Sequence, residues 1–240
     1  MQAVSNHVFY LPHSTETDRP ALGYVHGAHA ALMVDAGNSP AHVRQFLGDL
    51  HRQKLPLPDY TVLTHRHWDH CFGLSALNTL AIAGEKTAQA LKRASEIVWS
   101  RETLAAYLEA DEIREFSEQH ILLEYPQLSD IHIRVPEVRF SGRLEIDLGG
   151  CRCQLLEIPS PHSNDSVAVY IPEDRVLFLG DAGCEACAHG TWTDQPELLE
   201  ATLHTLETLD FTVCITGHDL PHTRERLFTW FHTRLQAVGR

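Results

Sequence analysis

Three histidines and an aspartate crowd into one short segment of this chain, where residues 64–70 read THRHWDH. The segment follows an apolar run, so His65 and His67 lie on the turn that leaves a predicted strand and project to one side of an extended backbone. Asp69 and His70 then point to a second, nearby position, just before a helix predicted to begin near residues 71–73. Neutral imidazole and carboxylate oxygen suit zinc, and they also tolerate iron or manganese. This spacing therefore predicts a metal site rather than scattered surface histidines.

Single His and Asp residues follow further apolar runs of the chain. QLLEIPSPH places His162 after one run, VLFLGD places Asp181 after the next, and TVCITGH places His218 after the last. Asp35 follows the run ALMV in the same way, although it could equally be an ordinary turn residue. Side chains at the ends of several strands in a layered α/β sheet converge on one rim, where such folds keep their ligand sites. We therefore expect these residues to lie beside the 64–70 segment.

The elements that must position these side chains alternate between short apolar runs and longer segments with helical spacing, which predicts a mixed α/β fold. Strands are predicted at 8–11, 21–26, 28–34, 61–64, 80–83, 138–140, 143–146, 152–158, 167–171, 175–179 and 212–216, and helices at 40–53, 86–93, 196–209 and 223–238. The strands on either side of Pro172 are predicted to form a hairpin. Ser39 is a suitable N-cap, with Pro40 at the first helical position. Without repeats or a linker, residues 1–240 are predicted to form a single domain.

Composition narrows the function classes. Hydrophobic residues make up 43% of the 240 residues, enough for a substantial core. The formal net charge is −13 and the longest basic cluster is Lys92 with Arg93, which disfavours nucleic-acid binding. No run approaches the roughly 18 apolar residues of a membrane helix, and the first twenty residues lack the pattern of a signal peptide. We therefore expect no membrane association and a cytoplasmic location.

Six unevenly spaced cysteines fit free thiols in a reducing compartment better than a disulfide framework. Cys184 and Cys187 form a C-x-x-C shortly after Asp181, and Cys151 and Cys153 form a C-x-C on a predicted strand. These four could hold a structural zinc ion or form a redox pair, although the doubled C-x-x-C of a zinc ribbon is missing. The sequence leaves this question open.

In the order of its motifs the chain resembles the metallo-β-lactamase superfamily: an early Asp that ends a strand, H-x-H-x-D-H, a single His, an Asp in G-D-A and a late G-H. The resemblance implies an αββα sandwich, with two mixed sheets face to face and helices outside. It also implies two metal positions, the first with ligands His65, His67 and His162 and the second with ligands Asp69, His70 and His218. Asp181 would bridge them, and Asp35 would orient the metal-binding loop from behind.

The chemistry implied by this resemblance is hydrolysis. Two metal ions about 3.5 to 4 Å apart lower the pKa of a shared water and polarise a carbonyl or phosphoryl oxygen. We expect two divalent ions, zinc first and iron or manganese as alternatives, whose bound hydroxide attacks a small-molecule ester, thioester or lactone. Asp69 would be both a ligand and the catalytic residue that holds this nucleophile. The implied relatives are the glyoxalase II and lactonase side of the superfamily.

Two other activities remain open at this point. Sulfur dioxygenases that resemble this family keep the motif and bind a single iron, and phosphodiesterases share the fold. Flavodiiron relatives are excluded, because they replace the second histidine of the motif with an acid, whereas His67 is intact here. The residues fix neither the substrate nor the native metal, and a homodimer is one option for the oligomeric state.

The stretch 95–125 interrupts the strand pattern with helix formers, which predicts an inserted helical cap over one side of the metal rim. Segments near a site commonly carry its specificity, so Tyr107 and Phe116 of this stretch are candidate pocket residues. Packing on the body or a dimer contact is the alternative for them. Trp192 and His222, which follow later motifs, are two further candidate pocket residues.

Overall fold

Seven short strands form the first sheet of the computed structural model, which describes residues 1–238. In sheet order they are β1 (Gln2–Ala3), β2 (Val8–Leu11), β3 (Leu22–His26), β4 (Ala31–Val34), β5 (Tyr60–Val62), β6 (Leu80–Gly84) and β7 (Val138–Phe140). Strands β1 to β4 pair antiparallel, and β4 to β7 pair parallel. The parallel half places the ends of β4 and β5 at the same edge, so the residues that follow these strands come together.

A second sheet has the strand order β15-β14-β11-β10-β9-β8. Its members are β8 (Arg143–Asp147), β9 (Arg152–Glu157), β10 (Val167–Ile171), β11 (Val176–Gly180), β14 (Val213–Thr216) and β15 (His222–Thr223). The predicted hairpin around Pro172 is confirmed as the antiparallel pair β10 and β11. Strand β14 runs parallel to β11, so the chain leaves both strands at the same edge. A separate small hairpin, β12 (Ala186–Ala188) with β13 (Thr191–Thr193), was not predicted.

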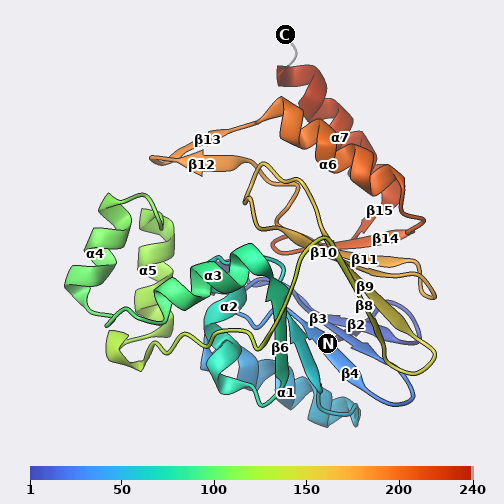
Figure 1. The fold of residues 1–240 in the computed structure, drawn as a ribbon, viewed down its shortest axis with the longest axis horizontal. Helices are drawn as coiled ribbons and strands as arrows, with labels where there is room; N and C mark the ends of the chain where they lie inside the picture. The colour runs from blue at the N-terminus through green and yellow to red at the C-terminus, as the bar shows by residue number, and fades with distance from the viewer. Residues whose placement is uncertain (239–240) are drawn as a thin grey trace.

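Helices lie outside the two sheets and at one of their edges, as Figure 1 shows. They are α1 (Pro40–Gln53), α2 (Trp68–Cys71), α3 (Glu85–Ala94), α4 (Arg101–Glu109), α5 (Glu115–Glu124), α6 (Pro196–Glu207) and α7 (Arg224–Val238), with 3-10 turns at Thr15–Thr17, Phe72–Ala76 and Leu128–Asp130. The predicted cap of α1 is confirmed, because the Ser39 side chain accepts a hydrogen bond from the His42 N–H at 3.2 Å. No helix within residues 1–238 combines the length and apolar character needed to cross a membrane.

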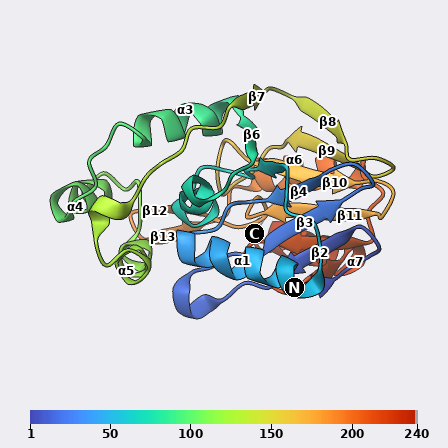
Figure 2. The same ribbon diagram turned by 90° about the horizontal axis from the view of Figure 1, so that it is seen from below.

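Three apolar layers hold this architecture together, because successive side chains of each buried strand point to opposite faces. Phe46 of α1 and Met33 of β4 belong to the layer on the outer face of the first sheet. Val34 of the same strand packs between the sheets, where Phe178 of β11 also lies. Leu203 of α6 belongs to the third layer, on the outer face of the second sheet. The αββα sandwich predicted from the sequence is thus confirmed (Figure 2).

Several predicted boundaries differ from the observed ones, and two of the differences have a local reason. Residues 28–30 do not extend β4, because the backbone N–H groups of Ala28 and His29 donate to the carbonyls of Gly149 and Leu148 in the turn between β8 and β9. The helix expected near residues 71–73 begins earlier, at Trp68, and continues as a 3-10 turn from Phe72.

The stretch 95–125 contains the two helices α4 and α5, which lie beside α3 and the β12–β13 hairpin, away from α6 and α7 (Figure 1). Ser100 caps α4 in a capping box with Thr103, in which each side chain accepts a hydrogen bond from the backbone N–H of the other residue. Trp99 and Leu104 are buried at the base of this segment. These contacts fix α4 and α5 to the body of the fold at the edge where the strands of both sheets end.

Candidate metal centre

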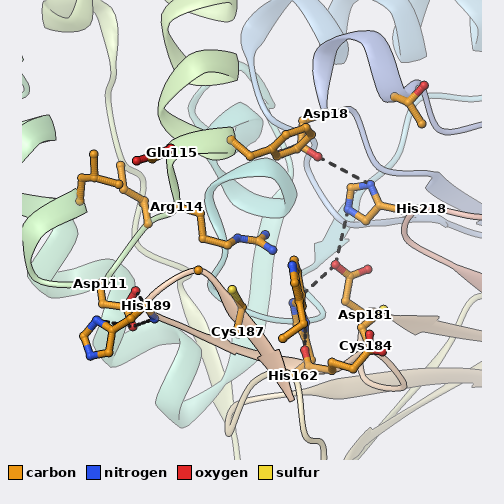
Figure 3. Close-up of a pocket in the computed structure, with 17 residues that line it drawn as sticks. Asp18, Asp111, Arg114, Glu115, His162, Asp181, Cys184, Cys187, His189 and His218 are labelled. Atoms are coloured by element: carbon orange, nitrogen blue, oxygen red, sulfur yellow. Dashed lines mark hydrogen bonds and ion pairs between the residues drawn. The ribbon is translucent and has the colours of Figure 1, made fainter. Parts of the chain in front are cut away.

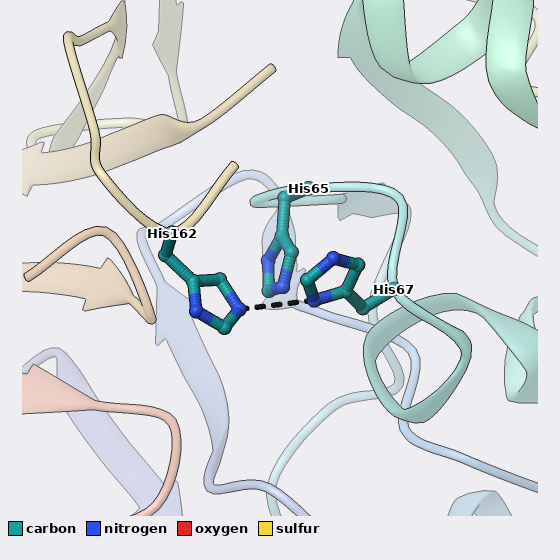
Figure 4. A group of neighbouring side chains, drawn as sticks. All are labelled: His65, His67 and His162. Atoms are coloured by element: carbon teal, nitrogen blue, oxygen red, sulfur yellow. Dashed lines mark hydrogen bonds between the residues drawn. The ribbon is translucent and has the colours of Figure 1, made fainter. Parts of the chain in front are cut away.

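Three imidazoles meet at the edge shared by the two sheets (Figure 4). His65 and His67 come from the loop after β5, and His162 comes from the loop between β9 and β10. His162 Nε2 lies 2.9 Å from His67 Nδ1, and one nitrogen from each ring lies within 4.8 Å of the other two. Three convergent imidazole nitrogens form a common zinc ligand set.

A second group of ligand atoms lies beside the first. Its members are Asp69, His70, Asp181 and His218, each of which offers an atom within 4.8 Å of the others. Asp181 Oδ2 lies 3.4 Å from Nε2 of His70 and 3.4 Å from Nε2 of His218. The same oxygen lies 3.6 Å from His162 Nε2 of the first group. Asp181 therefore stands between the two groups, where a bridging carboxylate would stand.

The Asp35 carboxylate contacts the loop after β5 and the His70 ring on the side away from the ligand groups. Its Oδ1 accepts the backbone N–H of Thr64 at 2.7 Å, and its Oδ2 accepts the Thr64 hydroxyl at 2.9 Å. The same Oδ2 lies 2.8 Å from His70 Nδ1, while the Thr64 hydroxyl lies 3.1 Å from His65 Nδ1. Because the Nδ1 atoms of His65 and His70 are engaged here, their Nε2 atoms face the ligand groups, as metal-binding histidines require.

Three buried polar atoms of the centre lack a hydrogen-bond partner within residues 1–238: His65 Nε2, His70 Nε2 and Asp181 Oδ1. His70 Nε2 lies 3.2 Å from Asp69 Oδ2 but makes no hydrogen bond there. Unpaired buried polar atoms are rare, because each one costs the free energy of its lost hydration. Divalent cations coordinated by these nitrogens and oxygens would satisfy all three, so the residues present fit a dinuclear metal centre.

The first ligand group stays neutral. Burial lowers the pKa of His65 and His67 well below the ordinary value, and the neighbouring histidines add to this shift. Burial also lowers the pKa of His162. Neutral imidazole is the form that binds metal, so this group needs no deprotonation before it coordinates an ion.

The second ligand group carries more negative charge. Burial alone would lower the pKa of His218, but Asp181 and Asp69 raise it to about 10. The same two carboxylates, with Asp35, hold the pKa of His70 well above its ordinary value against the effect of burial. In the metal-free protein, protons on these histidines balance the buried carboxylates. A divalent cation would take over that role and release the protons.

Asp18 is a site residue that the sequence analysis missed. It is buried, with its Oδ1 3.9 Å from Nδ1 of His218, whereas Asp69 contacts the other ring nitrogen. Burial and the negative charge of Asp69 raise its pKa to about 6. Asp18 follows a 3-10 turn rather than a strand, and its φ of 49° is left-handed. No motif in the sequence marks such a position, so only the fold could reveal it.

A cavity of about 1030 Å³ opens onto the metal centre (Figure 3). Its floor includes His162, Asp181 and His218. Phe116 of α5 and Trp192 of β13 line its walls, and about half of the surface of each residue is exposed, 48% and 51% respectively. Both residues therefore lie where a pocket residue would lie.

A second cavity of about 560 Å³ adjoins the first, with which it shares His162 and Arg114, and residues of α4 contribute to its lining. Tyr107 lines it, with its ring centroid 5.3 Å from that of the buried Trp99. His222 is placed elsewhere: it lies in β15 with Nε2 3.0 Å from Asp219 Oδ2, and it lines neither cavity.

The four cysteines in question do not gather at one place. Cys184 and Cys187 line the first cavity, whereas Cys151 and Cys153 are buried between the sheets. Cys151 instead neighbours Asp174, with Sγ 3.9 Å from Oδ2. All six cysteines of the chain are free thiols. A single site made from both cysteine pairs is therefore inconsistent with the fold.

Gly217 leaves the space that Asp181 occupies. A Cβ at this position would lie 2.1 Å from Asp181 Oδ1 and 3.0 Å from His70 Cε1. We expect Gly217→Ala to displace the Asp181 carboxylate and to weaken metal binding by about 10-fold or more. Elemental analysis after dialysis against a weak chelator measures this change. Gly48→Ala on α1 is the control, because its Cβ meets only an Arg52 nitrogen at 3.5 Å; equal metal retention in both variants would contradict the prediction.

Comparisons with known proteins concern the family and the fold of this chain. A family model described as the metallo-beta-lactamase superfamily matches residues 22–218. A metallo-beta-lactamase family protein of Thermus thermophilus is similar, with a TM-score of 0.66 at 20% identity over 98% of this chain and 81% of that one. A metallo-beta-lactamase of Pontibacter korlensis has a TM-score of 0.63 at 17% identity over 98% of this chain and 96% of that one.

A longer protein, the stereoselective inverting sec-alkylsulfatase of a Pseudomonas species, has a TM-score of 0.66 at 13% identity. The match covers 96% of this chain and 40% of that one. At such identities the likeness concerns the fold alone. No curated protein matches the chain.

Proposed function

Because this chain belongs to the metallo-beta-lactamase superfamily, we propose that it is a dinuclear metal-dependent hydrolase acting on a small-molecule ester, thioester or lactone. The superfamily consists mostly of metal-dependent hydrolases. The observation that carries the proposal is the position of Asp181 Oδ2, within 3.6 Å of ring nitrogens from both ligand groups. A carboxylate in that place serves two metal ions better than one.

The ligand atoms of the two groups indicate which metal ions they would bind. His65, His67 and His162 offer only nitrogen, while Asp69 and Asp181 add carboxylate oxygen to the second group. Such mixed nitrogen and oxygen sites favour zinc, with iron or manganese as alternatives. When bound, two such ions would activate a water molecule and polarise the carbonyl under attack.

The surrounding residues have separate roles in this proposal. Asp69, whose Oδ2 accepts a hydrogen bond from His218 Nε2 at 3.0 Å, would orient the attacking water as well as bind metal. Asp35 would keep His70 in the ring orientation that directs Nε2 at the centre. The cavity of about 1030 Å³ has room for a small molecule, and its walls include apolar side chains such as Phe116.

A panel of substrates on protein of measured metal content tests this function. It contains thioesters, lactones, aryl esters, phosphodiesters, β-lactams and a secondary alkyl sulfate. We expect turnover of a carboxylic ester, thioester or lactone by protein that holds two zinc ions, and loss of turnover after chelation. One iron per chain with oxygen uptake would instead indicate a dioxygenase. Turnover confined to phosphodiesters would show that the substrate is a phosphodiester and not a carboxylic ester, thioester or lactone.

The helices α4 and α5 are proposed to select the substrate. Phe116→Ala and Tyr107→Ala each remove an aromatic wall from one of the two cavities, so we expect the ranking of substrates in the panel to change more than the metal content. Leu123→Ala on α5 is the matched control, because Leu123 is 63% exposed and lines neither cavity. If the two aromatic variants lower all rates in equal proportion, or change only the melting temperature, α4 and α5 are structural.

A further inference from the structure

Arg114 lies at the junction of the two cavities and lines both of them. It is the residue just before α5, in an extended backbone conformation. Its guanidinium carbon lies over the Trp192 ring, 4.5 Å from the centroid, in a cation–π contact that restrains the cation. In Figure 3 the side chain extends into the cavity toward His162 and Asp181. A positive charge is thus held in place and directed at the candidate metal centre.

Within residues 1–238, no carboxylate forms an ion pair with Arg114. Other partly buried arginines of the chain do have such partners: Arg19 pairs with Glu124 at 2.7 Å, and Arg66 pairs with Asp165 at 3.1 Å. A cation–π contact leaves the N–H groups of a guanidinium free to donate. Arg114 therefore offers a set of unused hydrogen-bond donors inside the cavity.

The acids that line the first cavity with Arg114 are Asp18, Asp111, Glu115, Asp181 and Glu185, and none of them forms an ion pair with it. Arg114 is the one Arg or Lys among the described residues that line the first cavity. Asp111 is engaged elsewhere, since both its carboxylate oxygens lie 2.9 Å from the backbone nitrogen of His189. Figure 3 shows Glu115 on the far side of Arg114 from His162. An anion placed between Arg114 and the metal centre would therefore meet the guanidinium rather than Asp111 or Glu115.

From these contacts we infer that Arg114 binds a carboxylate on the substrate, at a distance from the bond that is hydrolysed. This inference rests on the proposed hydrolase function and narrows its substrates to anionic esters, thioesters and lactones. A planar guanidinium pairs with a carboxylate through two parallel hydrogen bonds, which fixes orientation as well as position. Leu108 and Phe116 line the same cavity and provide an apolar surface for the carbon chain between the two polar ends.

Two matched substrates test the inference. The acetyl esters of 4-hydroxyphenylacetate and of 4-hydroxyphenylacetamide differ in the charge of the side chain on the ring. The phenols that leave during hydrolysis are of similar acidity. We expect the wild-type protein to prefer the carboxylate ester through a lower KM. Arg114→Gln should lower the ratio of kcat/KM between the charged and neutral esters by on the order of 10-fold to 100-fold, mainly through KM, because a charge-assisted hydrogen bond is lost. The same ratio for Arg114→Lys should lie between those of the wild type and Arg114→Gln, since lysine keeps the charge but lacks the planar guanidinium.

Arg226→Gln is the control, because Arg226 is an exposed cation of α7 that lines neither cavity. It should keep the wild-type ratio. A wild-type protein without preference for the charged ester, or an Arg114→Gln variant that retains the preference, would overturn the inference.

Failure of the proposed function gives a different result, because metal-loaded protein would then hydrolyse neither ester. In that case calorimetry with 4-hydroxyphenylacetate and its amide tests Arg114 alone. Tighter binding of the carboxylate that is lost in Arg114→Gln supports the inference. Equal binding of the carboxylate to both proteins contradicts it.

Discussion

Replacing Asp181 with alanine is expected to remove both metal ions from the protein and to lower kcat by more than about 100-fold. The reason is geometric, because one carboxylate oxygen lies within 3.6 Å of His162 Nε2 in the first ligand group and within 3.4 Å of His70 Nε2 in the second. A variant that lost a ligand of only one group would keep the ion in the other group. Elemental analysis of the purified variant, with turnover of the best panel substrate, measures both effects.

Two further variants make this result interpretable. Asp181→Asn keeps the size of the side chain and removes its charge, so we expect it to lose metal as well. Asp219→Asn changes an exposed carboxylate that pairs with His222 outside both cavities, and it should keep two ions and full activity. An Asp181→Ala protein that folds and still holds one tightly bound ion at His65, His67 and His162 would show that Asp181 does not bridge.

The second large effect is expected at Asp35. Asp35→Asn should weaken metal binding by about 10- to 100-fold and lower the free energy of unfolding by about 1 to 3 kcal/mol. The buried carboxylate accepts the N–H and the hydroxyl of Thr64 and orients the His70 ring. An amide group cannot accept at both of its ends, so at least one of these contacts is lost. Competition with a chromophoric chelator gives the affinity, and thermal unfolding gives the stability.

The chain supplies a matched control for this prediction. Asp174 also lies 2.7 Å from a histidine nitrogen, His7 Nδ1, but at a place that lines neither cavity. Asp174→Asn should therefore change stability without changing affinity for the two ions. If Asp35→Asn binds metal as tightly as the wild type, Asp35 is an ordinary turn residue of the loop after β4.

The convergence of the ligands could be predicted because their positions follow from chain direction. His65 and His218 each come soon after a buried apolar strand, and such runs are short, apolar and bounded by turn residues. Parallel pairing of β4 with β5 and of β11 with β14 then brings the ends of these strands to one edge. The local sequence pattern and the sheet topology thus both bring the ligands to the same edge.

The positions of other site residues depend on contacts between distant segments, and no local sequence pattern predicts them. Asp18 reaches the site only because the turn before β3 folds against His218. Arg114 is held by its cation–π contact with Trp192, which belongs to a hairpin that the sequence did not predict. That hairpin has three residues in each strand and every residue of its second strand belongs to the surface, so it lacks the apolar alternation that marks a longer strand.

The most direct test of the dinuclear centre is a crystal structure of zinc-loaded protein with anomalous data at the zinc edge. We predict two peaks about 3.5 to 4 Å apart, with Asp181 between them. One peak should lie within bonding distance of His65, His67 and His162, and the other should lie within bonding distance of Asp69, His70 and His218. A single peak at full occupancy, or two peaks away from Asp181, would contradict the account.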